Sequence, residues 1–203
     1  MFGSGYVLLM RAKSSSGELT VTERARRAQI VEAAVRTVAE LGYAGASFKQ
    51  IAARAGLSST GLISYHFAGK QELVDEVFQE ILAVFGGFVL ERVDVGGTAA
   101  EELRTFLLAN VEFLRLHPDH LVALVRLRDH VTVRDGADSD HLALAALLRE
   151  GQRRGEFREF DADVMAMFVL ALRNGIAVKV REVDLDVCGD EWVEVVERAT
   201  RQG

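Results

Sequence analysis

The sequence predicts an all-α protein, and three observations lead to this prediction. The 203 residues include a single proline, so nearly every segment can form an uninterrupted helix. Hydrophobic residues make up 49% of the chain, which is enough for a substantial core. Apolar residues recur at helical spacing through most of the sequence. We expect an N-terminal domain of three helices, followed by a larger helical bundle.

The first predicted helix follows an N-terminal segment, 1–19, whose glycine, serine and two cations show no periodicity. We expect this segment to be a mobile arm. Thr20 and Glu23 have the spacing of a capping box, and Gly42 is a typical helix stop. Between them, one face of the helix carries apolar residues at helical spacing: Ile30, Ala34, Val38 and Leu41.

The next two predicted helices have the spacing of a helix-turn-helix. Ser47 and Gln50 form a second capping box, and Gly56 can adopt the left-handed conformation of a tight turn. Ser58 is expected to cap the following helix after a three-residue turn, so that this helix covers 58–67. The residues expected to hold the two helices together are Ile51, Ala52, Ala55, Leu57, Leu62 and Ile63.

The second helix of this unit has an outward face that suits DNA. In a helix-turn-helix, the second helix enters the major groove. An ordinary solvated helix carries Glu/Lys pairs on this face. The predicted helix instead carries small or amphipathic hydrogen-bonding residues, which are Ser59, Thr60, Ser64, Tyr65 and His66. The same pattern can also occur in a helical protein-interaction scaffold, which stays an alternative.

Charge is distributed unevenly along the chain. Residues 1–70 contain nine Lys or Arg and four Glu, a formal charge of +5, whereas the whole chain has −6 and the remainder therefore −11. A basic first third on an acidic body is expected when one part faces phosphates. Solvated charge on helix surfaces is common, so this asymmetry gives only supporting evidence.

The N-terminal third resembles the TetR family of bacterial repressors. The resemblance covers about fifty residues, and beyond them only length, helicity and a bend at residues 155–157 agree. It rests on Arg27-Ala28-Gln29-Ile30, Gly42-Tyr43, Ser47-Phe48-Lys49-Gln50-Ile51-Ala52, Ala55-Gly56-Leu57-Ser58 and Tyr65-His66-Phe67-Ala68-Gly69-Lys70-Gln71-Glu72-Leu73.

The resemblance implies which residues contact DNA. Ser64 stands where family members often have an aromatic residue, so the phosphate contact at this position is expected to be shorter or missing. Phosphate contacts fix the register and base contacts supply the sequence preference. The expected backbone contacts are Ser47, Lys49, Ser58, Tyr65, His66 and Lys70, and the residues expected to reach bases are Ser59, Thr60 and Tyr65.

The chain divides into the arm, a DNA-binding domain at 20–67 and a second domain at 68–203. The resemblance implies that the second domain binds a ligand and forms a dimer. Alternating residues at 125–133 leave a strand open as an alternative to helix. Helices are expected at about 70–93, 98–117, 119–131, 138–154, 161–183 and 189–202.

The helix at 161–183 is apolar on more than one face, as a helix between two partners is. One stripe contains Val164, Phe168, Ala171, Leu172 and Gly175. With the last helix, which supplies Trp192, Val195, Val196 and Ala199, it can form a two-fold four-helix dimer contact. The alternative is an intramolecular core.

Polar residues on apolar faces predict a ligand pocket. A small-molecule site needs a few polar groups among apolar side chains. If an arginine contacts the ligand, its planar fork favours a carboxylate or another anion. In the alternative, Arg128 and Arg173 pair internally with Asp129, Glu112 or Glu182, or reach solvent. The candidates are Phe85, Phe88, Phe106, Asn110, Arg128, Arg173 and Asn174.

Together with these observations, the resemblance implies a repressor that binds a palindromic operator as a homodimer and is released by a small molecule. The helix that begins at Lys70 is joined to the DNA-binding domain and lines the second domain, so it is a suitable lever between them. Activator action stays open.

An enzyme is the less favoured alternative, because the sequence offers no carrier for catalysis. His117 and His120 have a metal-like spacing, but a proline lies between them and no cysteine or HExxH pattern is near. No Walker loop or GxGxxG occurs, and Cys188 has no histidine close in sequence. We expect no catalytic residue, metal or cofactor. The single cysteine and the absence of a long apolar segment favour a cytoplasmic protein without a membrane anchor.

Overall fold

The computed structural model describes residues 20–92, 97–132 and 138–202, and within these ranges the chain is helical. The predicted N-terminal arm lies outside the described residues. The helices are α2 (Val21–Gly45), α3 (Phe48–Arg54), α4 (Gly61–His66), α5 (Lys70–Leu90), α6 (Ala99–Leu116), α7 (Pro118–Leu127), α8 (Ser139–Arg153), α9 (Ala162–Val178) and α10 (Leu185–Thr200).

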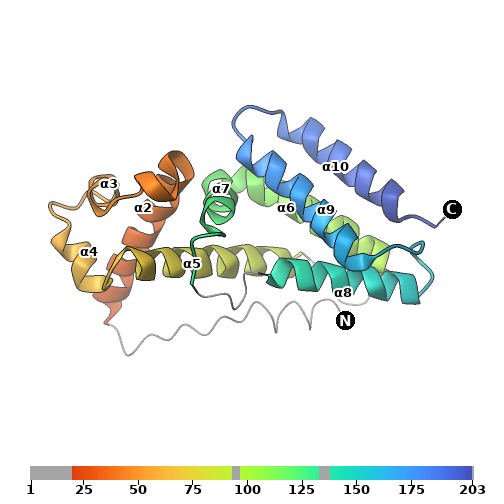
Figure 1. The fold of residues 1–203 in the computed structure, drawn as a ribbon, viewed down its shortest axis with the longest axis horizontal. Coiled ribbons are helices and arrows are strands. Elements are labelled where there is room, and N and C mark those ends of the chain that lie inside the picture. The colour runs from red at the N-terminus through yellow and green to blue at the C-terminus, as the bar shows by residue number, and fades with distance from the viewer. Residues whose placement is uncertain (1–19, 93–96, 133–137, 203) are drawn as a thin grey trace.

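Helices α2, α3 and α4 form one end of an elongated molecule, as Figure 1 shows. Helix α5 runs from this end towards the other, where α6, α8, α9 and α10 are gathered (Figure 1). Helix α7 packs against α2 and also against α5, α6 and α9. The DNA-binding domain predicted at 20–67 is therefore covered on one side by a helix of the predicted second domain.

The hydrophobic core is continuous between the two ends. It contains Ile30 and Ile63 near the N-terminus, Phe85 on α5, and Phe113 on α6, all of them fully buried. Burial of such side chains stabilises each by about 1.5–3 kcal/mol relative to exposure. The shared core makes the orientation of α2 dependent on how α5 and α7 pack.

Local capping signals in the sequence correspond to observed helix starts. The capping box of Thr20 and Glu23 opens α2, and that of Thr98 and Glu101 opens α6. Gly42 has φ of 71°, and this left-handed residue interrupts α2 where the sequence predicts its end.

Three expected helices of the second domain have other bounds, and the strand alternative is wrong for the described residues. Helix α7 ends at Leu127 instead of residue 131. Helix α9 ends at Val178 instead of residue 183, and α10 begins at Leu185 instead of residue 189. Asp184 explains the earlier start of α10, because its side chain accepts hydrogen bonds from the first-turn amides of this helix. At 125–132, helix α7 continues to Leu127 and a turn follows. Among the described residues, no helix is long and apolar enough to cross a membrane.

Candidate DNA-binding surface and buried polar core

The outward face of α4 and the turn before it carry the predicted DNA contacts. Ser58, Ser59, Thr60 and Ser64 are exposed, and the side chain of Tyr65 is 72% exposed. His66 is half-buried and packs edge-on against the ring of Tyr65. Ser47 and Lys49, on α3 and its N-cap, are also exposed. The structure thus brings the predicted DNA-contacting residues to one end of the molecule.

Helix α4, the predicted recognition helix that would enter the major groove, is shorter than the sequence predicts. It begins at Gly61, not at Ser58, and the preceding turn is longer than three residues. The amide of Leu57 donates to the carbonyl of Ala52 at 2.9 Å, next to Gly56 with φ of 67°. This C-terminal motif of α3 extends through Leu57, so the chain is still in the turn at Ser58. The prediction that Leu62 points inward is also wrong, since its side chain is 36% exposed.

Helix α2 holds the two helices of the helix-turn-helix by their C-termini. The side chain of Gln29 donates to the carbonyl of Ala55, the C-cap of α3, at 2.7 Å. The guanidinium of Arg27 donates to the carbonyl of His66, the last residue of α4, at 2.6 Å. Sequence reasoning assigned no role to either side chain, although both lie in the segment that carries the family resemblance.

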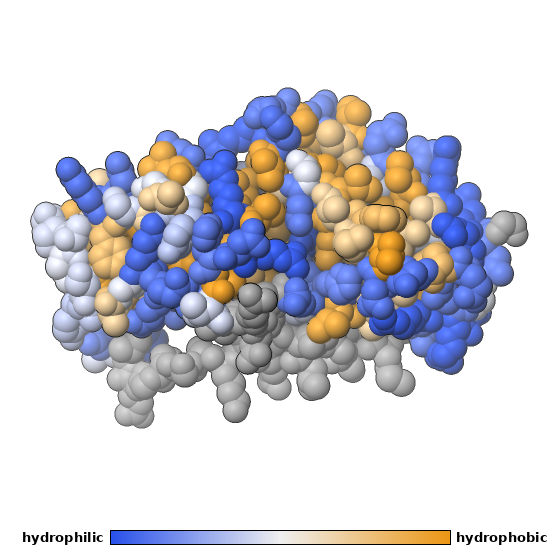
Figure 2. Space-filling model, viewed as in Figure 1, coloured by the Kyte–Doolittle hydropathy of each residue, from blue (hydrophilic) through white to orange (hydrophobic). Residues whose placement is uncertain are grey.

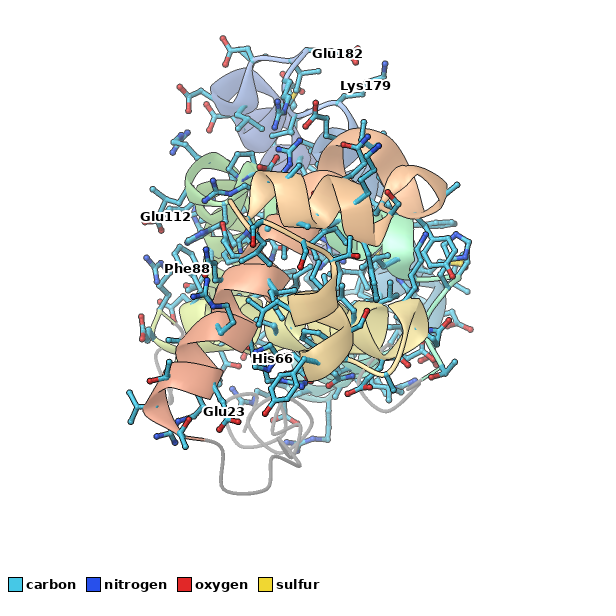
Figure 3. The ribbon with its side chains drawn as sticks, turned by 90° about the vertical axis from the view of Figure 1, so that its left-hand side faces the viewer. Glu23, His66, Phe88, Glu112, Lys179 and Glu182 are labelled. Atoms are coloured by element: carbon cyan, nitrogen blue, oxygen red, sulfur yellow. The ribbon has the colours of Figure 1, made fainter. Side chains whose placement is uncertain are left out.

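Glu23 is an acidic group next to the recognition helix. Its carboxylate accepts a hydrogen bond from the hydroxyl of Tyr65 at 3.4 Å, and Figure 3 shows Glu23 and His66 at the same end of the molecule. Hydrogen bonds from the backbone and side chain of Thr20 hold the pKa of Glu23 below its usual range. Glu23 is therefore a negative charge beside the predicted DNA contacts.

Lys70 and Lys49 differ in their surroundings. The ammonium of Lys70 donates to the carbonyl of Tyr43 at 2.5 Å and lies 4.1 Å from the centroid of the Tyr43 ring. Lys49 is exposed on α3. Both lysines lie on the part of the chain that carries the net positive charge.

Arg173 forms a buried ion pair in the core of the second domain. Its guanidinium donates to the carboxylate of Asp140 at 2.6 Å, and both side chains are less than 10% exposed. Asn110 is fully buried, and its carbonyl oxygen lies 3.5 Å from the same guanidinium. Asn174 accepts from Arg173 at 3.2 Å, and the ring of Phe85 lies 5.7 Å from the guanidinium carbon. The structure therefore gathers Phe85, Asn110, Arg173 and Asn174.

The remaining ligand candidates take other positions. Phe106 is buried, and its backbone carbonyl accepts a hydrogen bond from the Asn110 side chain at 2.7 Å. Phe106 thus contacts the Arg173 cluster through Asn110. Phe88 packs instead edge-on against Phe113. Arg128 is exposed and pairs with Asp138 at 3.1 Å, so it lies apart from the cluster.

Arg128 and Arg173 thus pair with acids of the chain itself. Their partners are not Asp129, Glu112 or Glu182, the acids named from the sequence. Glu112, which the sequence offered as a partner, pairs with Arg92 at 2.8 Å. Hydrogen bonding to Arg92 lowers the pKa of Glu112. Figure 3 shows Glu112 and Phe88 on the same side of the molecule, and the Arg92 guanidinium lies 3.4 Å from the Phe88 ring centroid.

His117 and His120 form an aromatic cluster with Phe113. The two imidazole centroids are 5.2 Å apart, and His117 lies 4.8 Å from the Phe113 ring. His120 faces α2, where its Nε2 is 3.9 Å from a carboxylate oxygen of Glu32. Burial lowers the pKa of His120, and Glu32 opposes this effect. Within the described ranges, no group of three or more His, Cys, Asp or Glu side chains could hold a metal ion.

An apolar stripe on α9 remains exposed. Val164, Met167, Phe168 and Leu172 are each 41–55% exposed. Figure 2 shows apolar residues gathered on the face over which α9 runs. The predicted contributions of α10 divide: Val195 is exposed, whereas Trp192 and Val196 are buried in the chain's own core. The internal core predicted as the alternative thus holds for Trp192 and Val196, whereas the partner surface stays a prediction for the exposed residues of α9.

These features define a class of protein, a helical protein with an N-terminal helix-turn-helix. Residues 30–77 match the model of the N-terminal domain of bacterial regulatory proteins of the tetR family. The regulator BetI 1 of Chromohalobacter salexigens is 39% identical over 67 residues, and BetI of Stenotrophomonas maltophilia is 33% identical over 91 residues. The alignments cover 33% and 44% of this chain, and 33% and 46% of these relatives.

Solved structures extend the likeness to most of the chain. A regulator from Saccharomonospora viridis in complex with choline has a TM-score of 0.72 at 22% identity, over 89% of this chain and all of that one. The regulator AibR, in complex with isovaleryl coenzyme A and operator DNA, has a TM-score of 0.73 at 20% identity, over 84% of this chain and 97% of that one. Residues 30–77 thus resemble the regulatory proteins of the tetR family, and the chain as a whole has the fold of these solved regulators.

Proposed function

We propose that this protein is a transcriptional regulator, a repressor that binds a palindromic operator in the cytoplasm as a homodimer and is released by a small molecule. The observation that carries the proposal is the exposed hydrogen-bonding face of α4 and its preceding turn. The exposed residues Ser59, Thr60 and Tyr65 carry hydroxyl groups on this helix-turn-helix, and readout of base edges and phosphates uses such groups.

Homodimer formation is supported by the exposed stripe on α9. Four large apolar side chains on one helix face are costly in water and typical of an interface with another chain. A two-fold contact through this stripe would place two recognition helices on one duplex, so half-sites of opposite orientation would be bound together.

The effector site is proposed around the Arg173 cluster on α5, α6 and α9. A buried cluster of polar groups beside Phe85 and Phe106 can orient a ligand. The solved regulator structures in complex with choline and with isovaleryl coenzyme A support the proposal that the effector of this protein is a small molecule. Asp140 already neutralises Arg173, so an anionic effector would have to displace this carboxylate. An effector that favours one position of α5 would change the DNA-bound population.

The proposal is tested by selecting duplexes from a random-sequence pool with the full chain and measuring their affinity. We expect selected sites with two-fold symmetry, and loss of binding in Tyr65→Ala. Arg153→Ala is the matched control, because this side chain is 72% exposed on α8, in the predicted second domain. If the wild-type chain enriches no sequence and binds duplexes no better than Tyr65→Ala does, the proposal is wrong.

A further inference from the structure

Arg27 occupies the junction of three helices. Its side chain begins on α2 and is only 20% exposed. One terminal nitrogen donates to the His66 carbonyl at the end of α4, and the other lies 3.1 Å from the carboxylate of Glu76 on α5. The guanidinium carbon lies 4.3 Å from the centroid of the buried Phe67 ring. The Arg27 side chain thus contacts the last residue of α4, the C-cap residue Phe67, and helix α5.

The recognition helix needs such support because it is short. Helix α4 has six residues, too few to be stable alone in water. The carbonyl groups of its last turn have no partner within the helix, and a cation near the C-terminus interacts favourably with the helix dipole. Arg27 supplies both a donor and a positive charge at this end.

Arg27 is also held from the opposite side. Glu76 neutralises the guanidinium, and a charge paired in this way is less available to a DNA phosphate. The planar fork of arginine lets its two terminal nitrogens engage a carbonyl and a carboxylate together, which a lysine ammonium does less well.

We propose that Arg27 is a positioning residue for DNA recognition: it fixes the recognition helix through the His66 carbonyl and ties it to α5 through Glu76. This inference rests on the proposed function. It assigns Arg27 no contact with DNA. Its loss is expected to loosen α4 while leaving the number of phosphate contacts unchanged.

The test compares Arg27→Ala, Arg27→Lys and Glu76→Gln with the wild type on one duplex that the wild type selects. We expect Arg27→Ala to weaken binding by about tenfold, as the loss of one charge-assisted hydrogen bond can. Arg27→Lys should recover part of the affinity, and Glu76→Gln should weaken binding less than Arg27→Ala. The slope of log affinity against log salt should stay at the wild-type value in all three variants, because no phosphate contact is removed.

Hydrogen exchange separates positioning from general stability. We expect faster amide exchange at Ser64–Phe67 in Arg27→Ala, with unchanged exchange in the buried part of α2 around Ile30. Arg36→Ala is the matched control, because Arg36 lies on the same helix in an exposed pair with Glu32. This control should alter neither affinity nor exchange in α4.

Three results would overturn the inference. A salt slope that falls by about one in Arg27→Lys or Arg27→Ala would make Arg27 a phosphate contact. Lower thermal stability with unchanged affinity would make its role structural only, as would faster exchange throughout the chain. If Arg27→Ala does not fold, Arg27→Lys decides by the same measurements. Failure of the wild type to bind any duplex contradicts the proposed function, whereas equal binding by wild type and variants contradicts this inference alone.

Discussion

The ammonium of Lys70 donates to the backbone carbonyl of Tyr43, and this bond ties the start of α5 to the end of α2. The ring of Tyr43 also stacks on His130, with centroids 3.9 Å apart, so the segment after α7 reaches the same point. Gln71 donates to the His130 carbonyl at 2.8 Å. The helix-turn-helix end and the helical bundle are therefore joined through Tyr43.

Lys70 and Lys49 should differ in their effect on stability while both affect DNA binding. An ammonium has three donors, so Lys70 can bind the Tyr43 carbonyl and a phosphate together. We expect Lys49→Met and Lys70→Met each to lower the salt slope by about one, on every duplex tested. Only Lys70→Met should also lower the melting temperature, by about 2–4 °C. Equal melting temperatures, or an unchanged slope, would contradict this prediction.

Thr60→Ala should change the sequence preference of the protein. Thr60 is exposed immediately before α4, and it is expected to reach a base edge. We expect a loss of about 1–3 kcal/mol of discrimination at one operator position, with the salt slope kept. Binding to a library of single-base variants of the selected duplex measures this directly. A uniform loss over all positions would instead indicate a backbone contact.

Sequence reasoning succeeded where the determinants are local. A capping box joins residues three apart, and a left-handed glycine acts on its own turn, so Thr20 and Gly42 could be interpreted without the fold. The start of α4 was misplaced because Ser58 is a good N-cap, but the C-terminal motif of α3 extends through Leu57. Two local signals competed there, and the sequence alone did not decide between them.

The contacts that organise the site join residues far apart in sequence. Arg27 and His66 are separated by 39 positions, and Asp140 and Arg173 by 33. Any of several acids could have neutralised Arg173, and the choice depends on how α8 packs against α9. The resemblance marked the segment around Arg27 as part of the family pattern, but the function of its guanidinium follows only from the position of α4 and α5.

Phe168→Glu should abolish the homodimer. The side chain is 55% exposed at the centre of the α9 stripe, and a charge buried there without a partner is strongly unfavourable. Sedimentation should show a monomer, and affinity for the symmetric duplex should fall towards that for a single half-site. Leu41→Glu is the control for sedimentation, because Leu41 is 44% exposed on α2, in the predicted DNA-binding domain. A Phe168→Glu variant that remains a dimer would place the interface elsewhere.

Arg173→Met should destabilise the protein more than removal of any surface arginine. It leaves the carboxylate of Asp140 buried without its charged partner, at a cost of about 3–5 kcal/mol in the free energy of unfolding. The double variant Arg173→Met/Asp140→Asn should recover much of this loss. Urea denaturation gives the free energies of unfolding of the wild type and the two variants, with Arg153→Met as a surface control expected to leave the denaturation midpoint nearly unchanged. A loss for Arg173→Met no larger than the control would show that the buried pair contributes little.

His120 should make the packing of α2 on α7 sensitive to mild acid. Burial lowers its pKa below the reference value of 6.5, so the folded chain binds fewer protons than the unfolded chain once the pH falls below that value. The contribution of neutral His120 is therefore fully present above about pH 6.5 and is lost as the pH falls towards the folded pKa. The groups around His120 are Glu32, His117, Asp119 and Arg36, and of these Glu32 and Asp119 oppose the effect of burial.

We expect the free energy of unfolding to decrease between pH 7 and pH 5 by more in the wild type than in His120→Gln, which has no proton to gain at this position. Parallel curves for the wild type and His120→Gln would show that the carboxylate of Glu32 compensates for burial.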